Sequence, residues 1–410
     1  MIRNYIQLAL KVLQRRKFFT FISLFGISLT LVVLMVATTL LDNLFAPRAP
    51  ESRFDRTLWV RTISIRGPQA EMTSEPGYRF LDRYVRALPG AERISFFTTD
   101  GRAAMYHRGR KIETHIRRTD GAYWQILDFH FLEGGPFTER DNQNANLVAV
   151  INADLRRELF GNAPAVGKTI EVDGQRFRVV GVVEPVPLTR VSAFSEIWAP
   201  VRTAKSRDYE QDLIGEFQAL VLAKKRSDFP ALRREFAERL ERFQFEDKRF
   251  NTVVAGLDTP FEAVARGMVG TGEHRALVLR AIMLLMALLF ITLPTLNLVS
   301  INLSRIMERA SEIGVRKAFG ASSRSLVGQF VVENVVLTLI GGAIGFLLTV
   351  IAIVALNRIE IVRYAVFDVN FRTLLYGIAV AAAFGVISGV YPAWRMSRMH
   401  PVQALRGGVR

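Results

Sequence analysis

A stretch in the middle of the chain carries most of the residues of a phosphate-binding loop. Five residues separate Gly161 from Gly167-Lys168-Thr169. A phosphate-binding loop has one residue fewer at this point, and a helix follows it, so that backbone amides surround the phosphates. The residues after Thr169 instead alternate like a strand. We therefore expect no nucleotide site here.

The other residues able to do acid–base, nucleophilic or metal chemistry also lack the spacing that such chemistry needs. None of the 5 histidines belongs to a His-x-x-x-His or Glu-x-x-His pattern, which metal sites on helices use. Glu139 and Asp141 fit a turn better than a pair of acid catalysts, and no Gly-x-Ser-x-Gly is present for a nucleophilic serine. The chain has 0 cysteines, so thiol chemistry is excluded. The sequence predicts a non-catalytic chain without a metal or cofactor of its own.

Four long apolar stretches predict four transmembrane helices. Half of all residues are hydrophobic, although 22% are charged. The apolar residues gather in uncharged blocks of 22 to 24 residues, where about 20 residues cross a bilayer. These blocks are 18–41, 281–303, 334–356 and 373–394. The first is too long for the apolar part of a signal peptide, so we expect it to remain as an anchor.

The position of the basic residues predicts which side of the membrane each segment occupies. The net charge is +16, and lysines and arginines concentrate in 1–17, 304–333 and 395–410. Such clusters beside spans mark the cytoplasmic side, and anionic lipid accounts for them without a nucleic-acid partner. Both termini are then cytoplasmic, while 42–280 and the short loop 357–372 lie outside. Residues 1–17 form either an amphipathic entry helix at the interface or an extension of the first span.

The large segment 42–280 predicts a two-part α/β domain, so the fold class is an α+β membrane protein with this domain inserted between helices 1 and 2. A strand–helix–strand order occurs in about 50–119 and again in about 201–260, which suggests one split α/β subdomain. The segment between them, about 120–200, is mostly β and reads as an inserted subdomain.

Local signals in this domain predict individual elements. The alternating residues 58–66 predict one strand, and Asp228 is placed to cap a helix over 229–243. Asn152 is placed to cap a short helix that Gly161 ends. Asp173-Gly174 predicts the two-residue turn of a β-hairpin.

The cytoplasmic loop contains a short charged segment, 305–321, that predicts a helix. Glu312 lies three residues after Arg309 and four before Arg316, so opposite charges share one helix face. Ile313 and Phe319 add an apolar edge, and Gly320 can end the helix. Because that edge would otherwise face water, we interpret the segment as a docking site for a partner rather than a solvated connector.

The same segment resembles a known family. Its pattern Glu-Arg-x-x-Glu-Ile-Gly-x-Arg-Lys-Ala-x-Gly-Ala is similar to that of MacB/FtsX-type ABC transporter permeases, the mechanotransmission class. The stretch Tyr5–Gly26 resembles the family's entry helix and first span, and Asp120–Val183 resembles its periplasmic core domain. The matching docking residues are Glu308, Arg309, Glu312, Ile313, Gly314, Arg316, Lys317, Phe319 and Gly320. The residues matching the family's closing motif are Tyr391, Pro392, Arg395, Pro401, Leu405 and Arg406.

The resemblance implies a permease subunit in the bacterial inner membrane with a periplasmic domain. It would pair with a second copy or a paralogous permease and bind two copies of an ABC ATPase, which hold ATP and Mg, through the 305–321 helix. Movement of the spans would then drive export or extraction of a substrate at the outer side. The macrolide-exporter branch of the family has a fused N-terminal ATPase, and we expect this chain to lack one.

Two further questions remain open in the sequence. The alternative function is an FtsX-like signalling subunit that activates an extracytoplasmic partner such as a cell-wall hydrolase; a periplasmic adaptor or outer-membrane factor is a further implied partner. Gly341 and Gly345 form a Gly-x-x-x-Gly motif, which permits close helix contact and would serve either dimerisation or packing within the chain.

Overall fold

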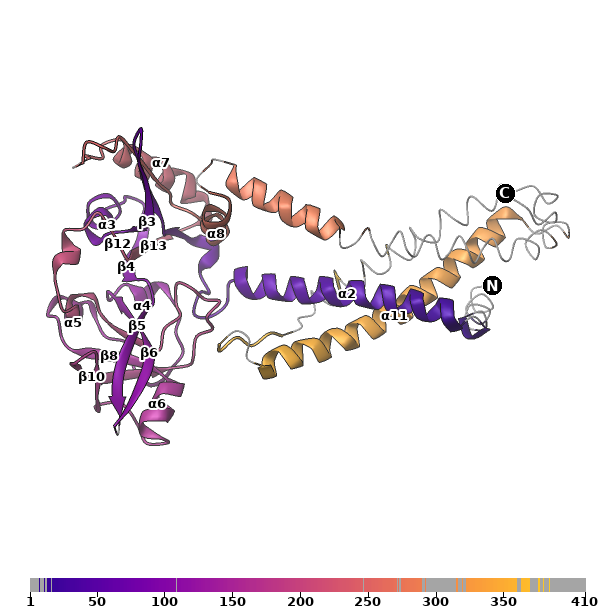
Figure 1. Ribbon diagram of the computed structural model, residues 1–410, viewed down its shortest axis with the longest axis horizontal. Helices are drawn as coiled ribbons and strands as arrows, with labels where there is room; N and C mark the ends of the chain where they lie inside the picture. Colours follow the sequence, from indigo (N-terminus) through magenta and orange to yellow (C-terminus); the bar gives the residue numbers. More distant parts are fainter. Residues whose placement is uncertain are drawn as a thin grey trace. The chain divides into compact units, whose positions relative to one another are not determined.

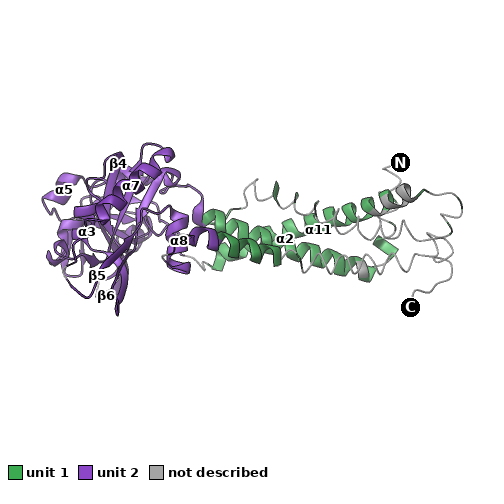
Figure 2. Cartoon of the chain, turned by 90° about the horizontal axis from the view of Figure 1, so that it is seen from above, with its two compact units in different colours: residues 1–43, 280–361, 366–410 green, residues 44–279, 362–365 purple. Residues whose placement is uncertain are grey.

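The computed structural model describes most of the chain and divides it into two units. It describes residues 17–289 except 108, 246, 271, 273, then 322–359 and 363–368, and the isolated positions 7, 11, 13–15, 292, 315, 319, 375, 376, 379 and 383. A helical unit contains residues 1–43, 280–361 and 366–410, and a globular domain contains 44–279 and 362–365 (Figure 2).

The described part of the helical unit contains two helices that are long and apolar enough to cross a membrane. Helix α2, Lys17–Phe45, includes the candidate span Thr20–Phe45. Helix α11, Ser323–Ile359, includes the candidate span Val331–Ile359. These agree with the first and third predicted spans. The predicted spans 281–303 and 373–394 lie largely outside the described residues, so four spans remain a prediction.

Helices α2 and α11 cross each other (Figure 1) and pack through the glycine motif. A Cβ added to Gly341 would lie 2.8 Å from Cγ2 of Ile27, and one on Gly345 would lie 3.1 Å from Cβ of Leu31. The Ser28 hydroxyl donates to the Gly341 carbonyl at 2.9 Å. Of the two uses predicted for the motif, the structure has packing within the chain.

We expect Gly341→Ala to weaken this helix pair by roughly 1–3 kcal/mol, because the new methyl overlaps Ile27. Gly328→Ala is the matched control on the same helix, where no atom lies within 4 Å of the added Cβ. There alanine should be neutral or stabilise by up to about 1 kcal/mol through helix propensity. Unfolding of both purified variants in denaturing detergent measures the difference. Equal stability of the two would contradict the packing role.

The globular domain is built on one large mixed sheet and one small antiparallel sheet. In the 10-stranded sheet the order is β1-β13-β4-β6-β11-β8-β10-β9-β5, with β7 paired to β10. The small sheet has the order β12-β3-β2-β14. The strands are β1 Thr57–Val60, β2 Ile63–Arg66, β3 Glu71–Pro76, β4 Ala91–Thr98, β5 Gly101–His107, β6 Arg110–Thr119, β7 Phe131–Gly134, β8 Val148–Asn152, β9 Thr169–Val172, β10 Gln175–Val183, β11 Ile197–Pro200, β12 Ile214–Gly215, β13 Phe217–Ala223 and β14 Thr252–Ala255.

Short helices cover these sheets and complete three apolar cores. They are α3 Tyr78–Tyr84, α4 Tyr123–Ile126, α5 Glu139–Gln143, α6 Ala153–Phe160, α7 Phe229–Leu240 and α8 Pro260–Val269. Helices α3 and α7 pack with β13 in the first core, and α6 packs with β8 and β10 in the third. The second core joins Phe97 and Leu220 to Tyr123 and Trp198. It therefore contains residues from both expected subdomains, whose division stays a prediction.

Several local predictions are confirmed. Asn152 caps α6 by accepting from the Leu155 amide at 2.8 Å, and Gly161, with φ 63°, follows the last turn. Strands β9 and β10 form the predicted hairpin. Asp173 and Gly174 at its turn have φ 50° and 76°, as a type I′ turn requires.

Two local predictions are wrong. Residues 58–66 form two strands in different sheets, because β1 pairs with β13 while β2 pairs with β3 and β14. Asp228 precedes α7 but does not cap it with its side chain. Its carboxylate instead accepts from the Lys225 amide at 3.0 Å, which stabilises the preceding turn.

Candidate functional site

The predicted docking helix and closing motif fall almost entirely outside the described residues. Of the named positions, the structure describes Phe319 alone. Its side chain is 89% exposed, and its amide donates to the Val315 carbonyl at 3.1 Å. Docking itself stays a prediction.

The stretch that resembles a phosphate-binding loop is a tight turn before a strand. Gly167 has φ 87°, and Thr169 begins β9 rather than a helix. The Lys168 ammonium lies over the Phe160 ring, 4.5 Å from its centroid. The two side chains therefore pack on each other, and the helix that would direct amides toward phosphate does not follow.

Glu139 and Asp141 lie at the start of helix α5 and serve the helix. The Asp141 carboxylate accepts from the Thr138 amide at 2.8 Å, and the Thr138 hydroxyl accepts from the Asp141 amide at 3.2 Å, forming a capping box. Hydrogen bonds from Asn146 and Thr138 hold the pKa of Asp141 below its usual range. A carboxylate held ionised in this way is a poor proton donor.

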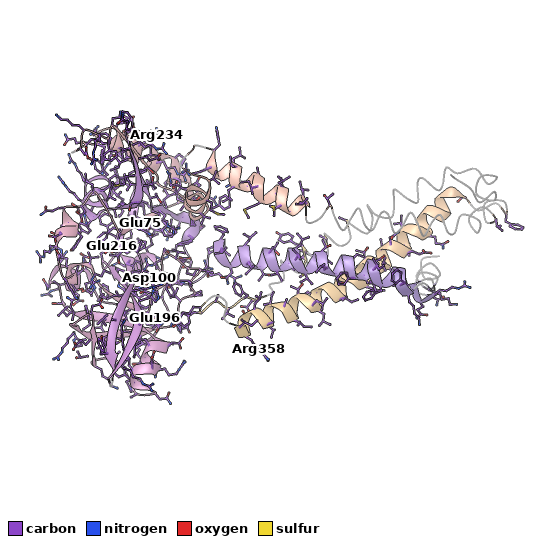
Figure 3. The ribbon with its side chains drawn as sticks, in the orientation of Figure 1. Glu75, Asp100, Glu196, Glu216, Arg234 and Arg358 are labelled. Carbon is purple, nitrogen blue, oxygen red and sulfur yellow. The ribbon has the colours of Figure 1, made fainter. Side chains whose placement is uncertain are left out.

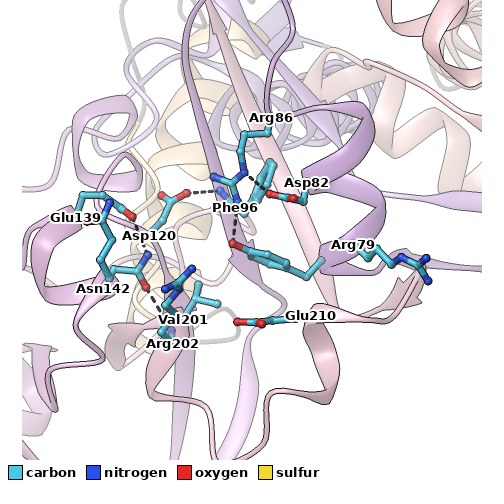
Figure 4. A pocket seen from close by; sticks show the side chains of 12 residues that line it. Arg79, Asp82, Arg86, Phe96, Asp120, Glu139, Asn142, Val201, Arg202 and Glu210 are labelled. Carbon is cyan, nitrogen blue, oxygen red and sulfur yellow. Dashed lines mark hydrogen bonds and ion pairs between the residues drawn. The ribbon is translucent and has the colours of Figure 1, made fainter.

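A polar cavity of about 390 Å³ lies where α3, α5 and the segment after β11 meet (Figure 4). It is lined by Tyr78, Arg79, Asp82, Arg86, Phe96, Asp120, Glu139, Asn142, Gln143, Val201, Arg202 and Glu210. Buried Asp120 accepts from Ser95 Oγ at 2.7 Å and from the amides of Phe96 and Tyr123 at 2.8 and 3.1 Å. Burial raises its pKa to about 6. Since Asp120 is held by backbone amides, its evident role is to fix the start of α4.

Two ionisable residues and a serine anchor the segment that follows α2 to the globular domain. Glu51 and Arg190 have side chains only 2% and 3% exposed, and Arg190 Nη1 lies 3.1 Å from Glu51 Oε2. Arg190 Nη1 also donates to the Ala46 carbonyl at 2.9 Å. The Ser192 hydroxyl donates to Glu51 Oε1 at 2.6 Å. The chain leaving the first span is therefore tied to the loop between β10 and β11.

Burial raises the pKa of Glu51 to about 7, although the hydrogen bond from Ser192 and the charge of Arg190 oppose the shift. The folded protein then keeps a proton that the unfolded chain releases above its ordinary pKa of about 4.3. Between these values the free energy of unfolding must fall as pH rises.

We expect the wild-type chain to lose roughly 2 kcal/mol more stability than Glu51→Gln between about pH 5 and pH 8, because only the wild type titrates at this position. Chemical denaturation of both proteins at the two pH values measures this difference. Parallel pH dependence in the two proteins would show that Glu51 is ionised throughout.

A second ionic cluster holds the segment that leads toward the second predicted span. Asp258 accepts from Arg266 Nε at 2.5 Å and Nη2 at 3.1 Å, and from Arg275 Nη2 at 2.5 Å. The side chains of Asp258, Arg266 and Arg275 are 6%, 5% and 15% exposed. The amide and carbonyl of Asp258 also pair with those of Trp59 in β1. Both ends of the inserted domain are thus fixed by buried polar side chains.

These clusters were not predicted, because no spacing pattern in residues 42–280 indicates a buried ion pair. The charged residues involved are spread over the chain, and Glu51 and Arg190 are 139 positions apart. Arg190 does stand among apolar residues in Pro187–Phe194, which is the one local signal of a buried charge. No group of three or more metal-binding side chains occurs among the described residues.

The described fold is a large α/β domain that lies in the chain between two helices, α2 and α11, each long and apolar enough to cross a membrane. Comparison with family models gives the particular family: residues 20–239 match the MacB-like periplasmic core domain, and residues 284–401 match the FtsX-like permease C-terminal region. The chain belongs to the MacB/FtsX-type family of ABC transporter permeases, as its sequence motifs predicted.

Several individual proteins are similar to this chain. The chain is 26% identical over 315 residues to the macrolide export ATP-binding/permease protein MacB of Bdellovibrio bacteriovorus, covering 75% of this chain and 46% of that protein. It is 26% identical to the uncharacterized ABC transporter permease YvrN of Bacillus subtilis, covering 83% of this chain and 82% of that protein. The solved periplasmic region of MacB from Actinobacillus actinomycetemcomitans matches with a TM-score of 0.37 at 15% identity. The match covers 53% of this chain and 94% of that structure. The chain spans about half the length of the MacB relatives.

Proposed function

We propose that this chain is the permease subunit of an ABC transporter and couples ATP hydrolysis by a separate ATPase to movement of its periplasmic domain. The observation that carries the proposal is the order of the two family matches, a periplasmic core domain followed by an FtsX-like permease region. The buried Glu51–Arg190 and Asp258–Arg275 pairs support it. They hold the two segments that enter and leave the domain in fixed geometry, which transmission of movement requires.

In this role the movement drives export or extraction of a substrate at the outer side of the inner membrane. Nucleotide and Mg bind to two copies of the ATPase, and a second permease copy completes the complex. The docking contact is the 305–321 helix. This chain contributes no catalytic residue.

The direct test is to purify the chain alone and together with the ABC ATPase encoded beside its gene. We expect the ATPase to co-purify and the complex to hydrolyse ATP, whereas the chain alone neither binds nor hydrolyses it. Stoichiometric nucleotide binding by the isolated chain, or failure of every neighbouring ATPase to bind, would contradict the proposal.

Single cysteines test the proposed topology, since the natural chain has 0. Ser206 lies exposed in the globular domain, and Ser322 directly precedes α11. We expect a membrane-impermeant thiol reagent to label Ser206→Cys in spheroplasts, which lack the outer membrane but keep an intact inner membrane. Ser322→Cys should react only after the inner membrane is opened. Labelling of both from the same side would overturn the assignment of the domain to the periplasm.

A further inference from the structure

The loop between β10 and β11, residues 184–196, binds two segments that are far apart in the sequence. Its Arg190 holds Glu51 and the Ala46 carbonyl, just after α2. Its other end binds Arg363 and Tyr364, which follow α11. The first segment leads along the chain from α2 directly into the domain. The second does not lead into the main part of the domain, so its attachment is an additional connection.

Glu196, which is labelled in Figure 3, is the centre of the additional connection. Its side chain is 5% exposed, and its Oε1 lies 2.7 Å from Arg363 Nη2 and 3.1 Å from the Tyr364 hydroxyl. Its Oε2 accepts from Thr114 Oγ1 at 2.8 Å and from the His115 amide at 3.2 Å. One carboxylate therefore joins the segment after α11 to β6 in the large sheet.

Backbone and ring contacts strengthen the same connection. The Leu188 amide donates to the Arg363 carbonyl at 3.1 Å. The Tyr364 ring lies 6.5 Å from that of Phe194, centroid to centroid, and packs against the second core. Desolvation raises the pKa of Tyr364 to about 12, so its hydroxyl keeps the proton that it donates to Glu196.

The next residues of this segment are bound by the helices of the other unit. The Phe367 amide donates to Asn357 Oδ1 at 3.0 Å, and Asn357 Nδ2 donates to the Phe367 carbonyl at 3.0 Å. Asn43 Nδ2 donates to the Val366 carbonyl at 3.2 Å. The boundary between the two units falls between Ala365 and Val366. In the segment 363–368, the first residues are thus bound to the domain. Residues 366 and 367 are bound to Asn43 and Asn357, near the ends of α2 and α11.

We propose that Glu196 is a positioning residue of a separate transmission path, through which α11 moves the globular domain by way of Arg363 and Tyr364. The proposal rests on the proposed function, because it concerns how that function is transmitted. An exposed connecting loop would need no buried carboxylate. The Arg363 side chain is 50% exposed, but the Glu196 side chain that it meets is 5% exposed and hydrogen-bonded on both oxygens.

The test uses the full permease in complex with its ATPase. Spin labels on Ser206→Cys in the domain and Arg358→Cys near the end of α11 report the distance between the two by pulsed electron paramagnetic resonance. Spectra are recorded without nucleotide and with ATP and vanadate. We expect Arg363→Ala to lower the ratio of the ATP-induced to the resting distance population by roughly 2- to 30-fold. ATP hydrolysis and co-purification of the ATPase should persist.

Two matched variants separate transmission from general damage. Arg363→Lys keeps the charge beside Glu196 and should restore most of the induced population. Arg176→Ala removes an exposed ion pair between Arg176 and Glu171, whose side chains are 79% and 53% exposed. This variant should leave the ATP-induced population unchanged. A full ATP-induced change in Arg363→Ala would overturn this path alone. Absence of any ATP-induced change in the wild-type complex would overturn the proposed function, and this inference with it.

Discussion

Replacing Ile313 with aspartate is expected to abolish co-purification of the partner ATPase. Ile313 is the apolar residue at the centre of the charged segment 305–321, flanked by Glu312 and Arg316. Truncating a buried anchor at an interface centre costs over roughly 2 kcal/mol, and a buried unpaired carboxylate costs more. The measurement is the amount of ATPase retained by the tagged permease after washing.

Arg316→Ala is the matched comparison on the same segment. A charge pair at the rim of an interface contributes under about 1 kcal/mol, so this variant should retain most of the ATPase. Expression and membrane insertion of both variants should equal those of the wild type, because the segment is predicted to be exposed in the free permease. If Ile313→Asp kept full ATPase binding, 305–321 would be a solvated connector.

Replacing Asp258 with alanine is expected to destabilise the globular domain by about 3–5 kcal/mol, because it leaves two arginines of a buried cluster without their anion. Arg266 and Arg275 both depend on Asp258. Since a domain is stable by only about 5–15 kcal/mol, much of the margin would be lost. The measurement is urea unfolding monitored by tryptophan fluorescence, because the backbone of Trp59 pairs directly with that of Asp258.

Two controls fix the cause of this loss. Asp258→Asn keeps the shape and one hydrogen-bonding oxygen, so it should destabilise less than alanine. Glu171→Ala removes the partner of Arg176 in an exposed pair and should cost under about 1 kcal/mol. Equal stability of Asp258→Ala and Glu171→Ala would mean that the buried cluster adds nothing to stability.

Elements with local signals could be predicted from the sequence. The turn Asp173-Gly174 and the cap Asn152 depend on the conformations and hydrogen bonds of a few neighbouring residues, and both were predicted correctly. The first and third spans were predicted because hydropathy and length alone decide them. In each case the information lies within one short window.

The arrangement of the strands could not be predicted in the same way. Strand β1 pairs with β13, so that Leu58 faces Val221 across the sheet, and no local pattern connects residues so far apart. The change of sheet between Val60 and Ile63 is equally hidden, because both halves alternate like a single strand. Asp228 shows the same limit, since a residue suited to capping a helix also suits the turn before it.

The candidate site divides along similar lines. The docking segment has a family motif, so its residues could be named although the structure describes only Phe319 and Val315 within it. The Glu196 connection has no motif and exists only because the segment after α11 meets the loop before β11. Tertiary contacts of this kind become visible when the chain is folded.

The close packing of Gly341 and Gly345 against α2 has a consequence for assembly symmetry. A twofold dimer needs a self-complementary patch that is free on each copy, and these glycines are already covered by Ile27 and Leu31 of their own chain. Elsewhere on α2, Phe18, Phe21, Phe25 and Leu29 are each at least 50% exposed. The symmetry axis of a homodimer must therefore run beside a surface other than the glycine motif.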